Sequence, residues 1–119
     1  MVTYFNFYNA FPHLDKVLHV SGGFIVAWFF TRLWLGLERI EIFNKFEYLV
    51  LCIALAAMVG FFWELMEYTA SVPPLEQYYW IHHYIYIGNV TDTLGDLLAD
   101  IFGGALFGLI DHHTRSSFL

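Results

Sequence analysis

The residues best suited to chemistry are carboxylates and one histidine in strongly apolar surroundings. Glu64 and Glu67 lie in GFFWELMEYTA, Asp96 and Asp100 in TLGDLLADIFGG, and His19 in LDKVLHVSGG. Carboxylate oxygens bind hard divalent cations, and a set that mixes carboxylates with imidazole suits zinc or iron. Without a metal ion, so many acids in one pocket would have to share protons. The sequence leaves these two solutions open.

The spacing of these residues places them on shared helix faces. Asp15 and His19 are four residues apart, Glu64 and Glu67 are three apart, and acids recur every four residues from Asp92 to Asp100. Side chains three or four positions apart project from one side of a helix. Each acid-bearing face continues through small residues, which let membrane helices approach closely. These small residues are Gly22 and Gly23, then Ala56, Ala57 and Gly60, then Gly103 and Gly104. We therefore expect the acids to point into a helix bundle.

The elements that must position these faces are predicted to be membrane spans. About 20 apolar residues cross a bilayer as a helix, and the candidates are residues 17–37, 47–70 and 93–110. Only 13% of the residues are charged and 59% are hydrophobic, whereas soluble domains carry about 25% charged residues. The alternative is a small soluble helical bundle with a very apolar core. We predict one all-α, polytopic membrane domain over residues 1–119.

The basic residues predict how the chain is oriented in a cell membrane. Lys and Arg concentrate on the cytoplasmic side of membrane proteins. Four of the five basic residues, Arg32, Arg39, Lys45 and Arg115, fall near the first link or the C-terminus, and only Lys16 falls on the other side. The N-terminus is therefore predicted outside and the C-terminus in the cytoplasm. The net charge of −6 without a basic patch argues against nucleic acid as a partner.

The link between the second and third spans is rich in aromatic residues. It contains YYWIHHYIY after Pro73 and Pro74, which end the preceding helix. Tyr and Trp gather at the headgroup level of membranes. We expect an interfacial segment here, in contact with membrane lipid, and a similar role for YFNFYNAF near the N-terminus.

Several of the acidic residues also have simpler interpretations. Glu64 and Glu67 near a helix end would simply face water, and His19 would be a hydrogen-bonded interior histidine. Asp92 in NVTDTLGD would belong to a helix N-cap. Asp15 would cap the first helix or pair with the neighbouring lysine.

The opposite ends of the spans carry a second group of polar residues. Asp111, His112 and His113 lie there, and a second site at this end is the less favoured interpretation. Arg32 and Arg39 are expected to serve as cytoplasmic anchors.

Three stretches together resemble a known family. LDKVLHVSGGFIVAWFFTRLW, WELMEY and YIGNVTDTLGDLLADIFGGALFG are similar to the YjdF family of small bacterial inner-membrane proteins, and more distantly to VanZ-like proteins. The resemblance covers roughly residues 15–109, and typical members carry further N-terminal spans that do not occur in this sequence. It implies a membrane protein with the same acidic pocket, and it implies no activity. The matching positions are Asp15, His19, Glu64, Glu67, Asp92, Asp96, Asp100 and Gly103.

Three functions compete on these grounds. The first is a protein that binds a cation, expected to be a divalent metal ion, or shares protons in an outer-leaflet pocket. The second is an accessory subunit of a larger membrane complex or a self-associating protein, and the third is a metal-dependent enzyme on a lipid-linked substrate. No nucleophile motif is present, so no catalytic residue is named. The predicted ligands are His19, Glu64, Glu67, Asp96 and Asp100, supported by Asp15, Lys16 and Asp92.

Overall fold

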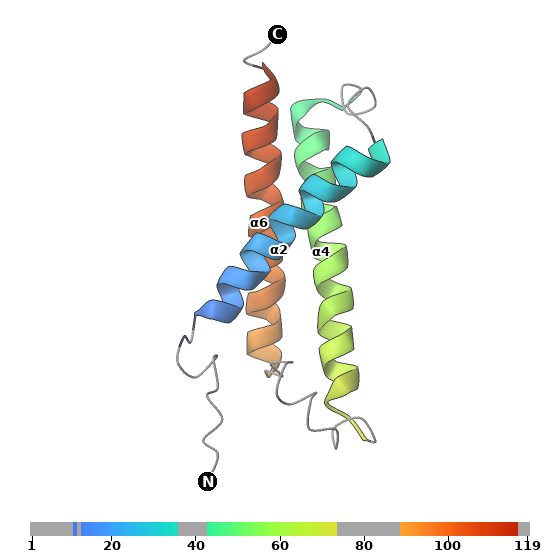
Figure 1. Cartoon of the computed structure of the whole chain (residues 1–119), viewed down its shortest axis with the longest axis vertical. Helices are drawn as coiled ribbons and strands as arrows, with labels where there is room; N and C mark the ends of the chain where they lie inside the picture. Colours follow the sequence, from blue (N-terminus) through green and yellow to red (C-terminus); the bar gives the residue numbers. More distant parts are fainter. Residues whose placement is uncertain (1–10, 12, 36–42, 74–88, 117–119) are drawn as a thin grey trace.

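The described part of the chain forms three helices packed against one another (Figure 1). The computed structural model describes residues 11, 13–35, 43–73 and 89–116. Helix α2 spans Leu14–Phe30 and continues into a short π-helix, η1, at Thr31–Leu35, while α4 spans Lys45–Ala70 and α6 spans Val90–Ser116. Helices α4 and α6 run in opposite directions, and α2 crosses both obliquely (Figure 1). The all-α prediction is confirmed for these residues.

Two of the three predicted spans correspond to helices that are long and apolar enough to cross a membrane. These are α4, whose most apolar 18-residue stretch has a mean hydropathy of 2.3, and α6 over Val90–Arg115, whose most apolar 18-residue stretch has a mean hydropathy of 1.5. The first predicted span, residues 17–37, begins earlier, at Leu14, and its α-helical part has 17 residues. Because its α-helical part is this short, α2 is not a candidate membrane span among the described helices.

The N-terminal ends of α4 and α6 lie before the predicted bounds because of capping. Asn44 and Glu47 form a capping box, so α4 begins at Lys45. Asn89 accepts a hydrogen bond from the backbone N–H of Asp92 at 3.0 Å and begins α6 at Val90. Helix α6 extends beyond the third predicted span, 93–110, to Ser116 and carries Arg115, which was expected in the tail. The predicted interfacial segments lie mostly outside the described residues.

Glycines allow α6 to approach both other helices closely. A Cβ on Gly23 of α2 would overlap the backbone of Asp100, and a Cβ on Gly103 of α6 would overlap the backbone carbonyl of Val20. A Cβ on Gly104 would lie 2.7 Å from both the Cβ of Ala56 and the carbonyl oxygen of Cys52 on α4. The small-residue faces are therefore the contact surfaces of the helices, and the acid-bearing turns continue these same surfaces.

Candidate metal centre

His19 lies at the centre of the candidate site and is held in one orientation by Asp100. The imidazole is 8% exposed, and its Nδ1 lies 3.1 Å from Oδ2 of Asp100 across the α2–α6 contact. When Nδ1–H donates to this carboxylate, the other ring nitrogen, Nε2, keeps its lone pair. Metal-binding histidines are usually oriented by such a carboxylate on the far side of the ring.

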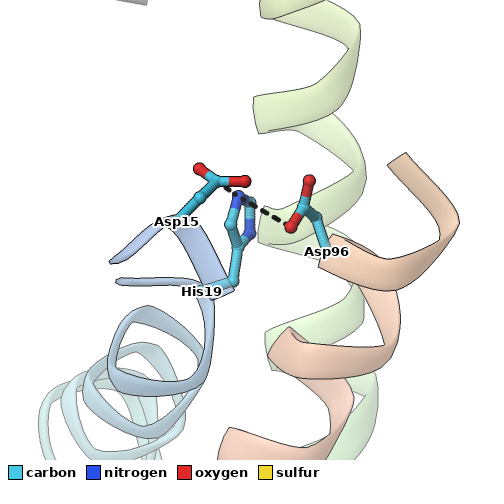
Figure 2. A group of neighbouring side chains, drawn as sticks. All are labelled: Asp15, His19 and Asp96. Atoms are coloured by element: carbon cyan, nitrogen blue, oxygen red, sulfur yellow. Dashed lines mark ion pairs between the residues drawn. The ribbon is translucent and has the colours of Figure 1, made fainter. Parts of the chain in front are cut away.

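The Nε2 atom of His19 faces three carboxylates from three helices. It lies 4.0 Å from Oδ1 of Asp15 on α2, 3.9 Å from Oε1 of Glu64 on α4, and 3.8 Å from Oδ1 of Asp96 on α6. Figure 2 shows Asp15, His19 and Asp96 converging. One potential ligand atom from each of these three residues lies within 4.8 Å of the others. A lone pair facing three carboxylates is repelled, so this nitrogen needs a proton or a metal ion.

Two buried carboxylate oxygen atoms at this point have no donor within hydrogen-bond distance among the described residues, although the side chain of Thr93 interacts with the Glu64 carboxylate and the Lys16 ammonium lies 3.6 Å from that of Asp15. They are Oε1 of Glu64 and Oδ2 of Asp15. Glu64 is 8% exposed, and its closest described cationic group, Nε2 of His19, is too far away for a direct hydrogen bond. A buried carboxylate oxygen without a partner is costly, so these atoms would be stabilised by a further cation or donor.

Lys16 is the principal cation of the cluster in the described residues. Its ammonium donates to Oδ1 of Asp96, lies 2.6 Å from Oδ1 of Asp92, and lies 3.6 Å from Oδ2 of Asp15. Asn89 supplies the helix cap, so the side chain of Asp92 pairs with Lys16 and does not act as the N-cap.

Glycines make space for the carboxylate of Asp100. A Cβ on Gly60 of α4 would overlap that carboxylate, whereas a Cβ on Gly22 would come no closer than 4.0 Å to it. Asp100 therefore occupies the volume that Gly60 leaves free at the junction of the three helices. This placement brings Asp100 to the far side of the His19 ring.

Glu67 is hydrogen-bonded within its own helix, although it interacts electrostatically with Glu64, Asp15 and His19. It is buried, but its Oε1 accepts a hydrogen bond of 2.8 Å from the indole N–H of Trp63 on its own helix. Of the predicted ligands, His19, Glu64 and Asp96 meet at Nε2, Asp100 lies on the opposite side of the ring, and Glu67 is satisfied by Trp63. Asp15, predicted only as a supporting residue, belongs to the central group.

The spacing around Nε2 is close to that of a metal site. In a tetrahedral zinc site with metal–ligand distances of about 2.0–2.2 Å, neighbouring ligand atoms lie about 3.3–3.6 Å apart. The three oxygens lie 3.8–4.0 Å from Nε2. Each oxygen therefore lies about 0.2–0.7 Å farther from Nε2 than in such a zinc site.

The opposite end of the bundle holds a second cluster around Asp111, whose arginine and tyrosine partners were not predicted from the sequence. Asp111 accepts hydrogen bonds from Arg32 of η1, from Arg115 of α6 and, at 2.7 Å, from the hydroxyl of Tyr48 on α4. Arg32, for which a role as cytoplasmic anchor stays a prediction, links η1 to α6 in this cluster. The pairing of Asp111 with Arg115 could be predicted from their spacing of four residues on one helix. The pairing of Asp111 with Arg32 has no such signal in the sequence.

A comparison with known proteins places the chain in a family. The family model described as "Predicted membrane protein (DUF2238)" matches residues 1–116. No curated protein and no solved structure matches the chain. The narrower resemblances to YjdF-like and VanZ-like proteins stay predictions. Because the match extends over nearly the whole sequence, this chain belongs to the Predicted membrane protein (DUF2238) family.

Proposed function

We propose that this chain is an integral membrane protein that binds a divalent cation in the buried cluster around His19. One observation carries the proposal. The Nε2 atom of His19 faces three carboxylate oxygens at 3.8–4.0 Å, while Asp100 holds the other ring nitrogen. This is the arrangement of a metal ligand with its outer carboxylate partner.

The donor set favours a transition metal over calcium or magnesium. Imidazole suits zinc, iron and related ions, whereas calcium and magnesium prefer sites made entirely of oxygens. His19, Asp15 and Asp96 would supply three ligands, and the unpaired Oε1 of Glu64 would supply a fourth. Such an ion would offset the excess of carboxylates at this end of the bundle.

The membrane arrangement proposed here has three spans. Helix α2 with η1 would form the first, since the two cover residues 14–35 without a break, a length of about 30 Å for a helix. Large apolar side chains on its outer face are exposed as if to lipid, namely Val17, Leu18, Ile25, Trp28, Phe29 and Leu33. With Arg32, Lys45 and Arg115 at the cytoplasmic end, the cluster around His19 would lie in the outer leaflet.

Metal binding by the purified protein tests the proposal. Protein stripped of metal in detergent is titrated with Zn²⁺ and Co²⁺ by calorimetry and by cobalt absorption spectroscopy. We expect one ion per chain and an affinity at least tenfold lower for His19→Gln and Glu64→Gln. Glu47→Gln is the matched control, because Glu47 is an exposed carboxylate at the start of α4, where it forms the capping box.

A specific result would contradict the proposal. If neither ion binds stoichiometrically and chelator leaves thermal stability unchanged, a metal ion does not hold the cluster together. Protonation of His19 and proton sharing among the carboxylates would then explain how the cluster is held together.

A further inference from the structure

Lys16 places its ammonium on the carboxylate oxygen that also faces His19. Nζ of Lys16 donates to Oδ1 of Asp96, and this same oxygen lies 3.8 Å from Nε2 of His19. The ammonium therefore contacts one of the atoms that would ligate the proposed ion. The ammonium of Lys16 and the proposed ion would compete for this one oxygen, which is buried because Asp96 is only 2% exposed.

We infer that Lys16 is a tethered counter-cation that competes with the divalent ion and sets the affinity of the site. The inference rests on the proposed function. A divalent ion bound to Oδ1 of Asp96 repels an ammonium on the same atom, because the two positive charges would lie close together beside a carboxylate that is only 3% exposed. Metal binding must therefore displace Lys16 from Asp96.

The structure offers Lys16 a second place to pair. Its ammonium already lies 2.6 Å from Oδ1 of Asp92 and 3.3 Å from the backbone carbonyl oxygen of that residue. Asp92 lies one turn earlier on α6 and its side chain is 23% exposed, while that of Lys16 is 38% exposed. The stem of Lys16 passes over Gly95, where a Cβ would come within 3.3 Å of its Cε. A short movement toward the helix end thus leaves Asp96 free and keeps Lys16 paired.

This competition has a consequence for which ions bind. A monovalent ion offers the same charge as the ammonium that it would replace, without the advantage of a tethered partner. A divalent ion gains more from the three carboxylates than the displaced ammonium loses. Lys16 therefore selects against sodium and potassium and lowers the affinity for divalent ions below what the carboxylates alone would give.

The test compares Lys16→Met with the parent protein in Zn²⁺ and Co²⁺ titrations, with Lys45→Met as the matched control. Lys45 is the first residue of α4, at the other end of the bundle, so it reports the effect of the substitution itself. We expect Lys16→Met to bind both ions at least tenfold more tightly and Lys45→Met to bind as the parent does. Stability gives a second readout. Lys16→Met should melt below the parent without metal, and saturating Zn²⁺ should remove or reverse that difference.

The possible outcomes separate the inference from the function on which it rests. Equal affinities of the parent and Lys16→Met would overturn the inference while leaving the metal site in place. Binding to Lys16→Met alone would confirm the competition and contradict metal binding by the natural chain. Absence of binding in both would overturn both claims.

Discussion

The two ends of the helix bundle solve the problem of buried charge in different ways. At the Asp111 end, one carboxylate receives two arginines and a tyrosine hydroxyl. At the His19 end, carboxylates outnumber cationic side chains, and Oε1 of Glu64 has no donor among the described residues. The first cluster is a structural clamp whose carboxylate has cationic partners, although Nη1 of Arg32 and Nε of Arg115 have no hydrogen-bond partner among the described residues. The second cluster has more carboxylates than cationic side chains.

Aromatic rings strengthen this contrast. The guanidinium of Arg32 lies 5.9 Å from the ring centroid of Phe107, and that of Arg115 lies 5.1 Å from the ring centroid of Tyr48. Both arginines therefore have an aromatic neighbour as well as their carboxylate. The Asp111 cluster joins η1, α4 and α6, so it fixes the three helices relative to one another. A rigid clamp at one end allows the other end to carry unbalanced charge without separating the helices.

The largest effect should come from removing the carboxylate of the clamp. Asp111→Asn leaves two arginines without their counter-charge. Breaking a buried ion pair is costly, and because the two arginines are partly exposed we expect a cost of about 2–4 kcal/mol. We expect a loss of this size in the free energy of unfolding, measured by SDS titration in mixed micelles. Glu64→Gln should leave the metal-free protein equally or more stable, since it relieves repulsion. A similar loss in both variants would remove the distinction between the two ends.

A smaller effect is expected at the helix crossing between the two clusters. Gly23→Ala would drive a methyl group into the backbone of α6 at Asp100, and overpacking of this kind costs about 1–3 kcal/mol. Gly22→Ala is the matched control, because its methyl group would meet only ordinary contact at 4.0 Å. Thermal unfolding in detergent should show the loss for Gly23→Ala alone. Equal behaviour of the two variants would mean that this close approach does not limit stability.

The orientation of His19 should affect metal affinity more than stability. Asp100→Asn keeps a hydrogen-bond acceptor near Nδ1 but removes its charge, and loss of such an outer partner lowers metal affinity by about 10–100-fold. Zn²⁺ titration measures the change, with Glu47→Gln as the reference. Unchanged affinity would show that Asp100 does not orient a metal-binding histidine.

The smallest effect should distinguish the two glutamates of α4. Glu67 is satisfied by Trp63, so we expect Glu67→Gln to change the Zn²⁺ affinity by less than about threefold, within the range of an indirect charge effect. A loss as large as that of Glu64→Gln would restore Glu67 as a ligand.

The faces of the helices could be predicted from sequence, whereas their partners could not. Residues four apart share a helix face whatever surrounds them, which is why Asp96 and Asp100 were expected to point inward together. The pairing of His19 with Asp100 depends on how deeply α2 crosses α6, and this depth is set by close contacts at Gly23 and Gly103.

The long-range ion pairs show the same limit. Arg32 and Asp111 are 79 positions apart, and no periodicity links them. Lys16 was expected near the acids, but its ion pairs with both Asp92 and Asp96 depend on the register of α2 against α6. The extra length of α6 was also missed, because its last turns carry polar side chains that resemble a tail.

The most direct test of the central claim is X-ray absorption at the zinc edge on the one-to-one complex in detergent. The account predicts one imidazole nitrogen and two or three carboxylate oxygens at about 2.0–2.2 Å, with the imidazole signal lost in His19→Gln. A spectrum of zinc surrounded only by oxygen, unchanged in His19→Gln, would place the ion elsewhere and contradict a metal centre at His19.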